Sequence, residues 1–169
     1  MGEALKQVSI YTDGACLGNP GPGGYGVVLL YGEHRKELSG GFRLTTSSRM
    51  EIKAAIAGVR ALKYPCAVTL YSDSKYVVDA MTKGWAKRWQ ANGWKRNKKD
   101  KAMNPDLWGE LLQLCEPHEI QFEWVKGHAG NVENERCDGL AVEAARQPEL
   151  SVDNCYEEAQ NPSQLFQEN

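Results

Sequence analysis

Residues 11–26 read YTDGACLGNPGPGGYG, and this stretch decides the fold that we expect. Just before it, residues 8–12 alternate apolar and polar side chains with β-branched content, which predicts a strand ending at Asp13. The glycine- and proline-rich run at residues 18–24 predicts a turn, because glycine supplies positive φ and proline blocks strand pairing. The next two strands are expected at residues 25–31 and 35–43. Together these strands predict an antiparallel meander.

Helices and further strands are expected in the rest of the chain. Residues 47–63 carry apolar side chains at helical spacing, and Pro65 ends the run. An apolar strand follows at residues 67–72, and a helix between two strands implies a right-handed crossover that makes this strand parallel to an earlier one. The remaining expected elements are helices at 75–81, 85–91, 105–115 and from 131 or 133 to 145, a strand at 120–125, and a charged protruding loop at 92–102.

Four acidic residues lie where predicted elements start or end, namely Asp13, Glu51, Asp73 and Asp138. Carboxylates that a fold gathers in this way form an oxygen-only site for hard divalent cations such as Mg²⁺. Such a site is typical of nucleases.

Three of these acids also have a purely structural explanation. Asp73 precedes Ser-Lys-Tyr-Val-Val and could cap the next helix. Residues 48–51, Ser-Arg-Met-Glu, fit a capping box, in which Glu51 would accept a bond from a backbone amide at the start of a helix. Asp138 could belong to the solvated face of the last helix. Taken one at a time, these residues leave both explanations open.

Charge is distributed unevenly along the chain. The formal net charge is −2, with a pI near 6.0. Residues 83–101 nevertheless contain eight lysines and arginines against one acid, Asp100, a local charge of +7. From residue 147 to residue 169 there are five acids and no lysine or arginine. The sequence therefore predicts a strongly polarised molecule with one basic segment.

Length, apolar content and cysteine usage point to one domain. A chain of 169 residues can bury a single core without disulfides or structural metals. No stretch approaches the roughly 20 apolar residues of a membrane span, so we expect a cytoplasmic protein. The five cysteines are odd in number and form no CxxC pair, so we expect plain thiols. Residues 148–169 are acidic and poor in apolar side chains, and we expect a disordered or loosely docked tail.

Three further strings join the opening one: SSRMEIKAA at residues 47–55, LYSDSKYV at 70–77 and WVKGHAGNVENERCD at 124–138. In this order they resemble type 1 ribonuclease H of the bacterial kind, over residues 6–145. The resemblance implies an α/β ribonuclease-H-like fold, a five-stranded mixed sheet with three antiparallel strands and then two parallel ones, flanked by helices. It implies a catalytic domain at residues 1–147 with a basic protrusion at about 83–102.

The resemblance implies an endoribonuclease that hydrolyses the RNA strand of RNA–DNA hybrids and leaves 5′-phosphate and 3′-hydroxyl ends. All four acids match the metal-binding carboxylates of the family, which would hold two Mg²⁺ or Mn²⁺ ions when substrate is bound. His128 lies on a glycine-flanked loop and would assist proton transfer or product release. The implied partner is the hybrid duplex, bound by a monomer away from any membrane.

The same resemblance implies a binding surface for the DNA strand. The basic protrusion would hold this strand, with an aromatic surface from Tyr76 and Trp85 lying against deoxyribose. Thr46 and Asn104 match residues that grip a DNA phosphate in some members, which carry an arginine where this chain has Leu44. Further contacts are expected from Lys87, Arg88, Trp89, Lys95, Lys98 and Lys99.

A second surface would read the RNA strand. Asn19 and the backbone around Cys16 match the loop that senses ribose 2′-hydroxyl groups, which distinguish RNA from DNA. Relatives often have Asn-Asn and Gln where this chain has Ser47-Ser48 and Lys75, and these positions are expected to contact the hybrid through shorter or different groups.

Two alternatives to a hybrid-cleaving enzyme follow from the same residues. Trp85 and Trp89 share one helical face, so the basic segment could simply bury tryptophans and expose lysines. A non-catalytic hybrid-binding module would have lost one or more carboxylates, and a DNA-cutting relative would lack the basic tryptophan segment and the GNPGPGG loop. This chain keeps all of these features, which favours the hybrid endonuclease.

Overall fold

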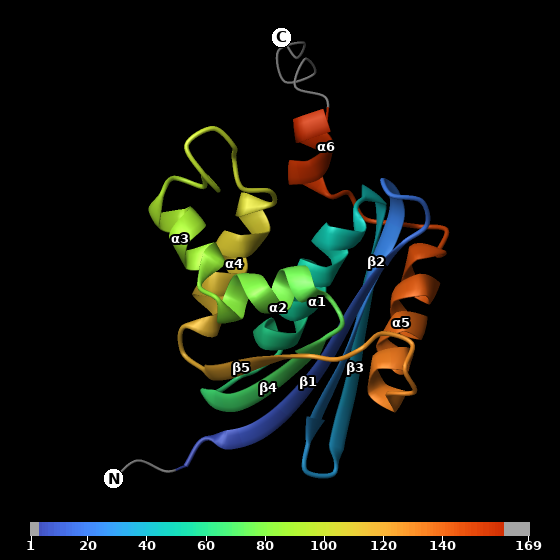
Figure 1. The fold of residues 1–169 in the computed structure, drawn as a ribbon. Coiled ribbons are helices and arrows are strands. Elements are labelled where there is room, and N and C mark those ends of the chain that lie inside the picture. The colour runs from blue at the N-terminus through green and yellow to red at the C-terminus, as the bar shows by residue number, and fades with distance from the viewer. Residues whose placement is uncertain (1–3, 161–169) are drawn as a thin grey trace.

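The computed structural model describes residues 4–160, and its centre is a single mixed sheet with helices on both faces (Figure 1). The strand order is β3-β2-β1-β4-β5. The strands are β1 (Lys6–Cys16), β2 (Gly21–Tyr31), β3 (His34–Thr45), β4 (Cys66–Ser72) and β5 (Glu119–Trp124). Strands β1 to β3 pair antiparallel, whereas β4 is parallel to β1 and β5 is parallel to β4. The predicted mixed sheet is confirmed.

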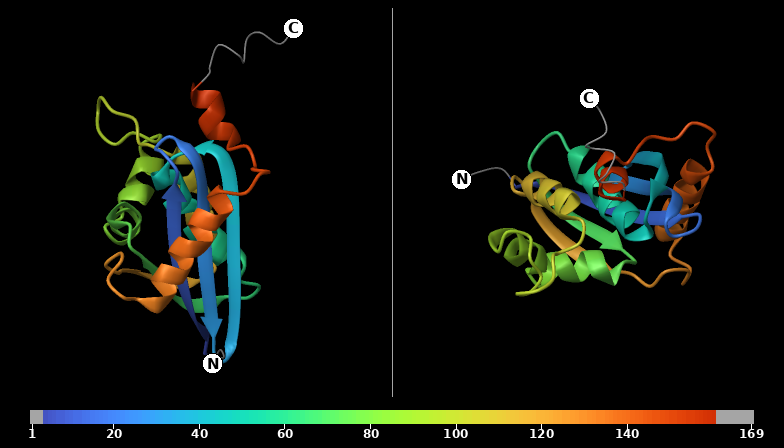
Figure 2. Two further views of the ribbon diagram at one scale, coloured as in Figure 1. Left: turned by 90° about the vertical axis from the view of Figure 1, so that its right-hand side faces the viewer. Right: turned by 90° about the horizontal axis from the view of Figure 1, so that it is seen from above.

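Helices cover both faces of the sheet. In the described part of the chain they are α1 (Ser47–Arg60), α2 (Lys75–Thr82), α3 (Trp85–Ala91), α4 (Pro105–Cys115), α5 (Val132–Ala145) and α6 (Asn154–Gln160). Helix α1 packs on one face, where Gly58 lies against Ile10 and Val27, and α5 packs on the other (Figure 2). None of these helices is both long and apolar enough to cross a bilayer.

The glycine- and proline-rich run differs from its prediction. We expected a turn through residue 24, but β2 already begins at Gly21. Proline is tolerated here because the β2–β3 register shifts between Gly21 and Gly23. At this bulge Pro22 has no partner residue on β3, so no backbone N–H is needed at its position for that pairing. A Cβ at Gly24 would collide with the backbone oxygen of Ala141 in α5. The last glycine of this run therefore also lets a helix approach the sheet closely.

The apolar core lies between the sheet and α1, and it fixes the register of the central strands. Ile10 and Leu70 on β1 and β4 are fully buried, together with Ile52 of α1 and Trp108 of α4. Burying side chains of this size stabilises the fold by roughly 1.5–3 kcal/mol each. A slip of one residue would turn a whole strand inside out, so this burial also fixes which residues stand at the strand ends.

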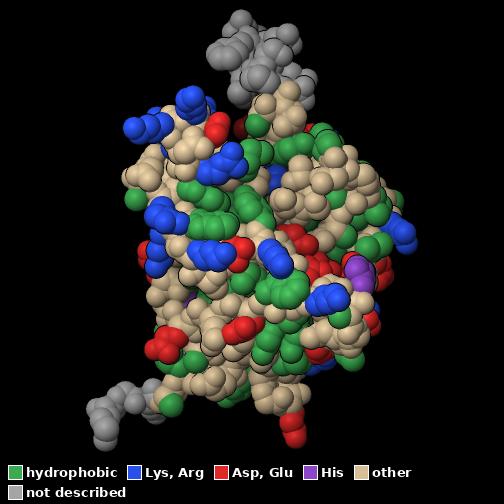
Figure 3. All heavy atoms as spheres, viewed as in Figure 1, with side chains coloured by type: hydrophobic (Ala, Val, Ile, Leu, Met, Phe, Trp, Pro, Cys, Tyr) green, Lys and Arg blue, Asp and Glu red, His purple; other side chains and the backbone are tan. Residues whose placement is uncertain are grey.

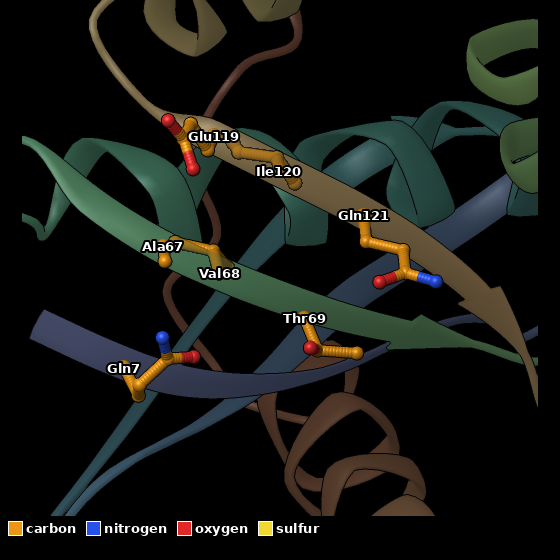
Figure 4. Close-up of a pocket in the computed structure, with 7 residues that line it drawn as sticks. All are labelled: Gln7, Ala67, Val68, Thr69, Glu119, Ile120 and Gln121. Carbon is orange, nitrogen blue, oxygen red and sulfur yellow. The ribbon is translucent and has the colours of Figure 1, made fainter. Parts of the chain in front are cut away.

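Among residues 4–160, no helix packs on one half of one sheet face. Helix α5 packs on β1, β2 and β3, while β4 and β5 beside it stay open. Figure 4 shows this open area, with Gln7 on β1, Thr69 on β4 and Gln121 on β5. These side chains are polar, which explains why water can cover this half of the face.

Part of the C-terminal segment, for which we expected a disordered or loosely docked tail, is docked by specific bonds. Ser151 forms a bridge beside β3, with hydrogen bonds from Arg43 N to Ser151 O (2.9 Å) and from Ser151 N to Gly41 O (3.1 Å). Asp153 is buried, and α6 follows it. The composition did not reveal this because a few specific polar bonds, not apolar content, hold the segment. Residues 161–169 of the predicted tail lie outside the described residues.

Candidate active site

Three of the four predicted carboxylates meet at the carboxyl ends of β1 and β4. Thr12 and Ser72 are partners in the parallel pairing, so Asp13 and Asp73, which follow them, are neighbours. Glu51 reaches the same place from α1. One carboxylate oxygen from each of these three acids lies within 4.8 Å of the other two.

Neither Glu51 nor Asp73 is used as a helix cap. Helix α1 is capped by Thr46, whose Oγ1 accepts a hydrogen bond from the Arg49 amide at 3.2 Å. Helix α2 is capped by Ser74, which accepts from the backbone amide three residues later. The capping-box explanation of Glu51 and the N-cap explanation of Asp73 are therefore wrong, and both carboxylates remain available to a ligand.

The electrostatics of the cluster disfavour three negative charges. Burial and then the charge of Asp73 raise the pKa of Asp13 to about 8, although the Gly14 amide donates to Asp13 Oδ1 at 2.9 Å. Burial and the charges of Asp13 and Asp73 raise the pKa of Glu51 well above its usual value. Glu51 Oε2 is enclosed and has no hydrogen-bond partner within residues 4–160. A hard divalent cation would neutralise the cluster and satisfy this oxygen, so the donor set fits such an ion.

Asp138 stands at the rim of this cluster. It lies on α5, is partly exposed and is not one of the three acids within 4.8 Å. Its negative charge nevertheless contributes to the raised pKa of Asp13. The structure thus brings three predicted carboxylates within 4.8 Å of one another and leaves the fourth outside this group.

The loop that carries His128 passes directly against Asp73. A Cβ at Gly127 would stand 2.7 Å from Asp73 Oδ2, so only glycine allows this approach. His128 itself is exposed and has a φ of 54°, which turns the chain sharply at this point. Trp124, at the end of β5, donates from its indole Nε1 to the Asp73 backbone oxygen at 3.0 Å. The imidazole is thereby carried on an open loop that borders the carboxylates.

Known proteins share this fold and sequence. The family model described as RNase H matches residues 5–146. A ribonuclease H from Syntrophus aciditrophicus is 71% identical over 151 residues, which are 89% of this chain and 87% of the relative. A ribonuclease H from Rippkaea orientalis is 66% identical over 157 residues, covering 93% of this chain and 96% of the relative. The crystal structure of LC9-RNase H1, a type 1 RNase H with the type 2 active-site motif, superposes with a TM-score of 0.77 at 34% identity, covering 86% of this chain and 74% of that one.

The chain belongs to the ribonuclease H family. It is accordingly a nuclease, and the activity that the family implies is endonucleolytic cleavage of RNA in RNA–DNA hybrids. Ribonucleases H depend on metal ions, and the cluster of Asp13, Glu51 and Asp73 is where the chemistry of this chain fits one.

The basic segment packs its tryptophans inward and exposes its cations, as the structural explanation predicts, while its contact with a nucleic acid stays a prediction. The rings of Trp85 and Trp89 are partly buried, with centroids 6.3 Å apart, and Trp89 packs edge-on against Trp108. The eight cations of the segment are all exposed, namely Lys83, Lys87, Arg88, Lys95, Arg96, Lys98, Lys99 and Lys101. In Figure 3 lysines and arginines cover the side of the molecule that carries α3, next to acidic side chains near the middle of the viewed face.

The predicted loop at residues 92–102 is an ordered hairpin. Lys95 and Lys101 form an antiparallel bridge, and the Ala102 amide donates to Trp94 O at 2.9 Å. At the tip, Asn97 Oδ1 accepts hydrogen bonds from the amides of Lys99 and Asp100. The local charge of +7 is therefore held on a defined scaffold rather than on a free loop.

The residues expected to read the RNA strand surround the start of α1. Asn19, in the β1–β2 loop, donates from Nδ2 to Ser47 Oγ at 3.1 Å and accepts from the Ser47 amide at 3.2 Å. Cys16 ends β1 next to this loop, and Ser48 follows on the exposed side of the helix. Lys75 stands at the start of α2, with its Nζ 4.8 Å from the centroid of the Trp124 ring.

The two residues expected to grip a DNA phosphate are linked by a residue that sequence reasoning missed. Thr46 and Asn104 cap α1 and α4, and Arg49 bonds to both, through its amide to Thr46 and through its Nη1 to Asn104 Oδ1 at 3.3 Å. Asn104 Nδ2 also donates to the Tyr76 hydroxyl at 3.3 Å. Arg49 lies inside the Ser-Arg-Met-Glu string that we interpreted as a capping box, so the sequence held no separate signal for it.

Proposed function

We propose that this chain is a divalent-metal-dependent endoribonuclease that cleaves the RNA strand of RNA–DNA hybrids and leaves 5′-phosphate and 3′-hydroxyl ends. The observation that supports it most strongly is the triad of Asp13, Glu51 and Asp73, with an enclosed carboxylate oxygen that lacks any protein partner among the described residues. Three clustered carboxylates, one buried and two partly buried, are a costly arrangement without a cation, and their use as ligands accounts for it.

The acids would hold two Mg²⁺ or Mn²⁺ ions in the substrate-bound state. Ions bound there supply activation of water and stabilisation of the leaving 3′-oxygen. Asp13, Glu51 and Asp73 provide the oxygen ligands, and Asp138 adds negative charge at the rim. His128 is exposed on the loop that passes against Asp73, and it would assist proton transfer or product release without serving as a metal ligand.

The hybrid would lie across the face that joins the carboxylates to the basic hairpin. The DNA strand would rest on Trp85 and Tyr76, with the cations of residues 87–99 holding phosphates outside the chemical centre. Asn19, paired with Ser47, would contact ribose 2′-hydroxyl groups of the RNA strand. One chain supplies both surfaces, which supports action as a monomer. Five free thiols suit the reducing cytoplasm.

A cleavage gel tests this function. A hybrid with its RNA strand labelled at the 5′ end is incubated with the protein in Mg²⁺, in Mn²⁺ and in EDTA, beside single-stranded RNA, duplex RNA and duplex DNA. We expect cleavage of the hybrid alone and only with metal. The labelled 5′ fragments should be ligated through their 3′-hydroxyl ends without prior dephosphorylation, and in a parallel reaction with a 3′ label the downstream fragments should be ligated through their 5′ ends without prior phosphorylation. Asp73→Asn serves as the matched inactive protein. Cleavage of duplex DNA, or of the hybrid in EDTA, would overturn the proposal.

A further inference from the structure

Arg49 joins three separate segments beneath the residues expected to grip a DNA phosphate. Its guanidinium is only 4% exposed. Nη1 and Nη2 donate to the two oxygens of Asp106 at 3.0 and 2.7 Å. Nε and Nη2 donate to the two oxygens of Asp153 at 2.7 and 2.9 Å. A buried guanidinium held by two carboxylates has one orientation, because any rotation would leave a charge unpaired.

Asp153 connects to both candidate phosphate ligands through this arrangement. Thr45 Oγ1 donates to Asp153 Oδ2 at 2.7 Å, and Thr45 directly precedes Thr46. On the other side, the Arg49 guanidinium that Asp153 orients donates to Asn104 Oδ1. The two ligands come from different elements, α1 and α4, and Asp153 is the residue outside both that fixes their common partner.

Asp153 belongs to the segment that lies beyond the family match, which ends at residue 146. The segment is held on both sides of Asp153. Ser151 exchanges backbone hydrogen bonds with Gly41 and Arg43, and Glu157 forms a two-pronged ion pair with the Arg43 side chain at 2.9 Å for each bond. The Tyr156 ring lies 6.0 Å from the Arg49 guanidinium carbon.

We propose that the C-terminal segment, residues 150–160, is a positioning element for substrate binding, in which Asp153 sets the spacing of Thr46 and Asn104 around one phosphate of the DNA strand. The inference rests on the proposed function, since it assumes that these two residues contact the hybrid. Hydrogen-bond donors on separate helices must be placed within about 0.5 Å to share one phosphate. A buried, doubly paired arginine supplies such placement, and the segment completes that pairing.

Steady-state cleavage of hybrids tests the proposal with Asp153→Asn, Asn104→Ala and the double variant. Asp153→Asn should raise KM about tenfold and leave kcat within twofold, because it disturbs binding away from the carboxylates. The double variant should bind no worse than Asn104→Ala alone, since both changes remove the same contact. A residue that only stabilises the fold would instead add its effect to that of Asn104→Ala.

A second readout locates the contact on the substrate. Hybrids carry a single neutral methylphosphonate at successive positions of the DNA strand, and one position should raise KM for the wild type. Asp153→Asn and Asn104→Ala should both lose sensitivity at that position. Thr45→Val, which keeps the charge pair but removes the 2.7 Å bond to Asp153, should raise KM by a smaller factor of about two to five. It supplies the test if Asp153→Asn fails to fold by circular dichroism.

Arg43→Gln is the matched control, because it removes an exposed ion pair to Glu157 and leaves the bonds of Asp153 to Arg49 and Thr45 in place. Its KM should stay within twofold of wild type. Additive effects in the double variant, or a KM for Thr45→Val equal to wild type, would overturn the positioning role. If Asn104→Ala keeps the wild-type methylphosphonate pattern, the phosphate assignment and the positioning role both fall. If the wild type leaves all hybrids intact, the proposed function itself is wrong.

Discussion

Replacing Asp13 by Asn should make the metal-free protein more stable while abolishing cleavage. Asp13 is 4% exposed and shares its site with Glu51 and Asp73, so its negative charge is both desolvated and repelled. Asparagine keeps the size of the side chain and a carbonyl oxygen for the Gly14 amide. It removes the charge, and with it one of the metal ligands.

The magnitude follows from the pKa of Asp13, which is raised to about 8. At pH 7 the folded protein keeps a proton on Asp13 that the unfolded chain has released, and pH 7 lies about three units above the ordinary pKa of a carboxyl. At 1.36 kcal/mol per unit, the wild type is destabilised by ~4 kcal/mol. This is an upper bound, because the buried amide loses part of the Gly14 hydrogen bond and must be desolvated itself, at about 1–2 kcal/mol. We expect a net gain of about 2 kcal/mol, or roughly 4–8 °C in Tm for a chain of this length.

The direction of this pKa shift determines how the stability of the wild type changes with pH. Because the folded-state pKa of Asp13 is raised, the folded protein keeps a proton that the unfolded chain has released between about pH 4 and pH 8. The stability of the wild type therefore falls as pH rises through this window. The advantage of Asp13→Asn should be small near pH 4 and complete above pH 8. Added Mg²⁺ should reduce this stability advantage of Asp13→Asn, because the ion stabilises the wild type, which keeps all of its carboxylate ligands.

Thermal unfolding by circular dichroism in EDTA, at pH 4, 6 and 8, is the measurement. Asp100→Asn, on the exposed hairpin, is the control and should change Tm by no more than about 2 °C. A folded Asp13→Asn protein whose Tm at pH 8 equals or falls below that of wild type would refute the reasoning, because the carboxylates would then not repel one another appreciably.

Three other changes separate chemistry from binding. Asp73→Asn should lower turnover more than tenfold in Mg²⁺ while fluorescence anisotropy shows hybrid binding retained, and turnover within tenfold of wild type would contradict a metal-ligand role. Neutralising the hairpin cations Lys95, Arg96, Lys98 and Lys99 should raise KM more than it lowers kcat. It should also flatten the slope of log K against log salt by up to about 0.9 per lost contact, whereas an unchanged slope would mark a merely solvated face. His128→Ala should keep KM near wild type and lower kcat by about 10²-fold or less, and a loss as large as that of Asp73→Asn would rule out an auxiliary role.

The order and type of the elements could be predicted because each carries its own local signal. The alternation before Asp13, the apolar spacing in α1 and the stop at Pro65 all act over a few residues, and the structure confirms the elements that they predict. The β2 start at Gly21 could not be predicted this way. Gly24 and Gly26 of this strand are required by the backbone of α5, more than 100 residues later in the chain, and that contact leaves no local pattern.

The site residues that belong to unusual motifs could be predicted from the sequence. The residues that act only through contacts with distant parts of the chain could not. Asp13 and Asp73 follow paired strands, so topology alone makes them neighbours. Arg49 and Asp153 stand 104 positions apart, and either residue alone suggests only a surface charge. A buried ion pair is visible only once the fold brings its halves together, and for the same reason the composition of residues 148–160 suggested disorder.

The first turns of α1 join the two parts of the substrate site. Thr46 and Arg49 serve the expected DNA contact, while Glu51 belongs to the carboxylate cluster. Helix α1 is seated against β1 so closely that a Cβ at Gly14 would stand 2.5 Å from the backbone of both Met50 and Glu51. A shift of this helix end would therefore move the candidate phosphate ligands and a metal ligand together. The C-terminal segment holds Arg49 through Asp153 and is accordingly placed to affect binding without touching a carboxylate of the cluster.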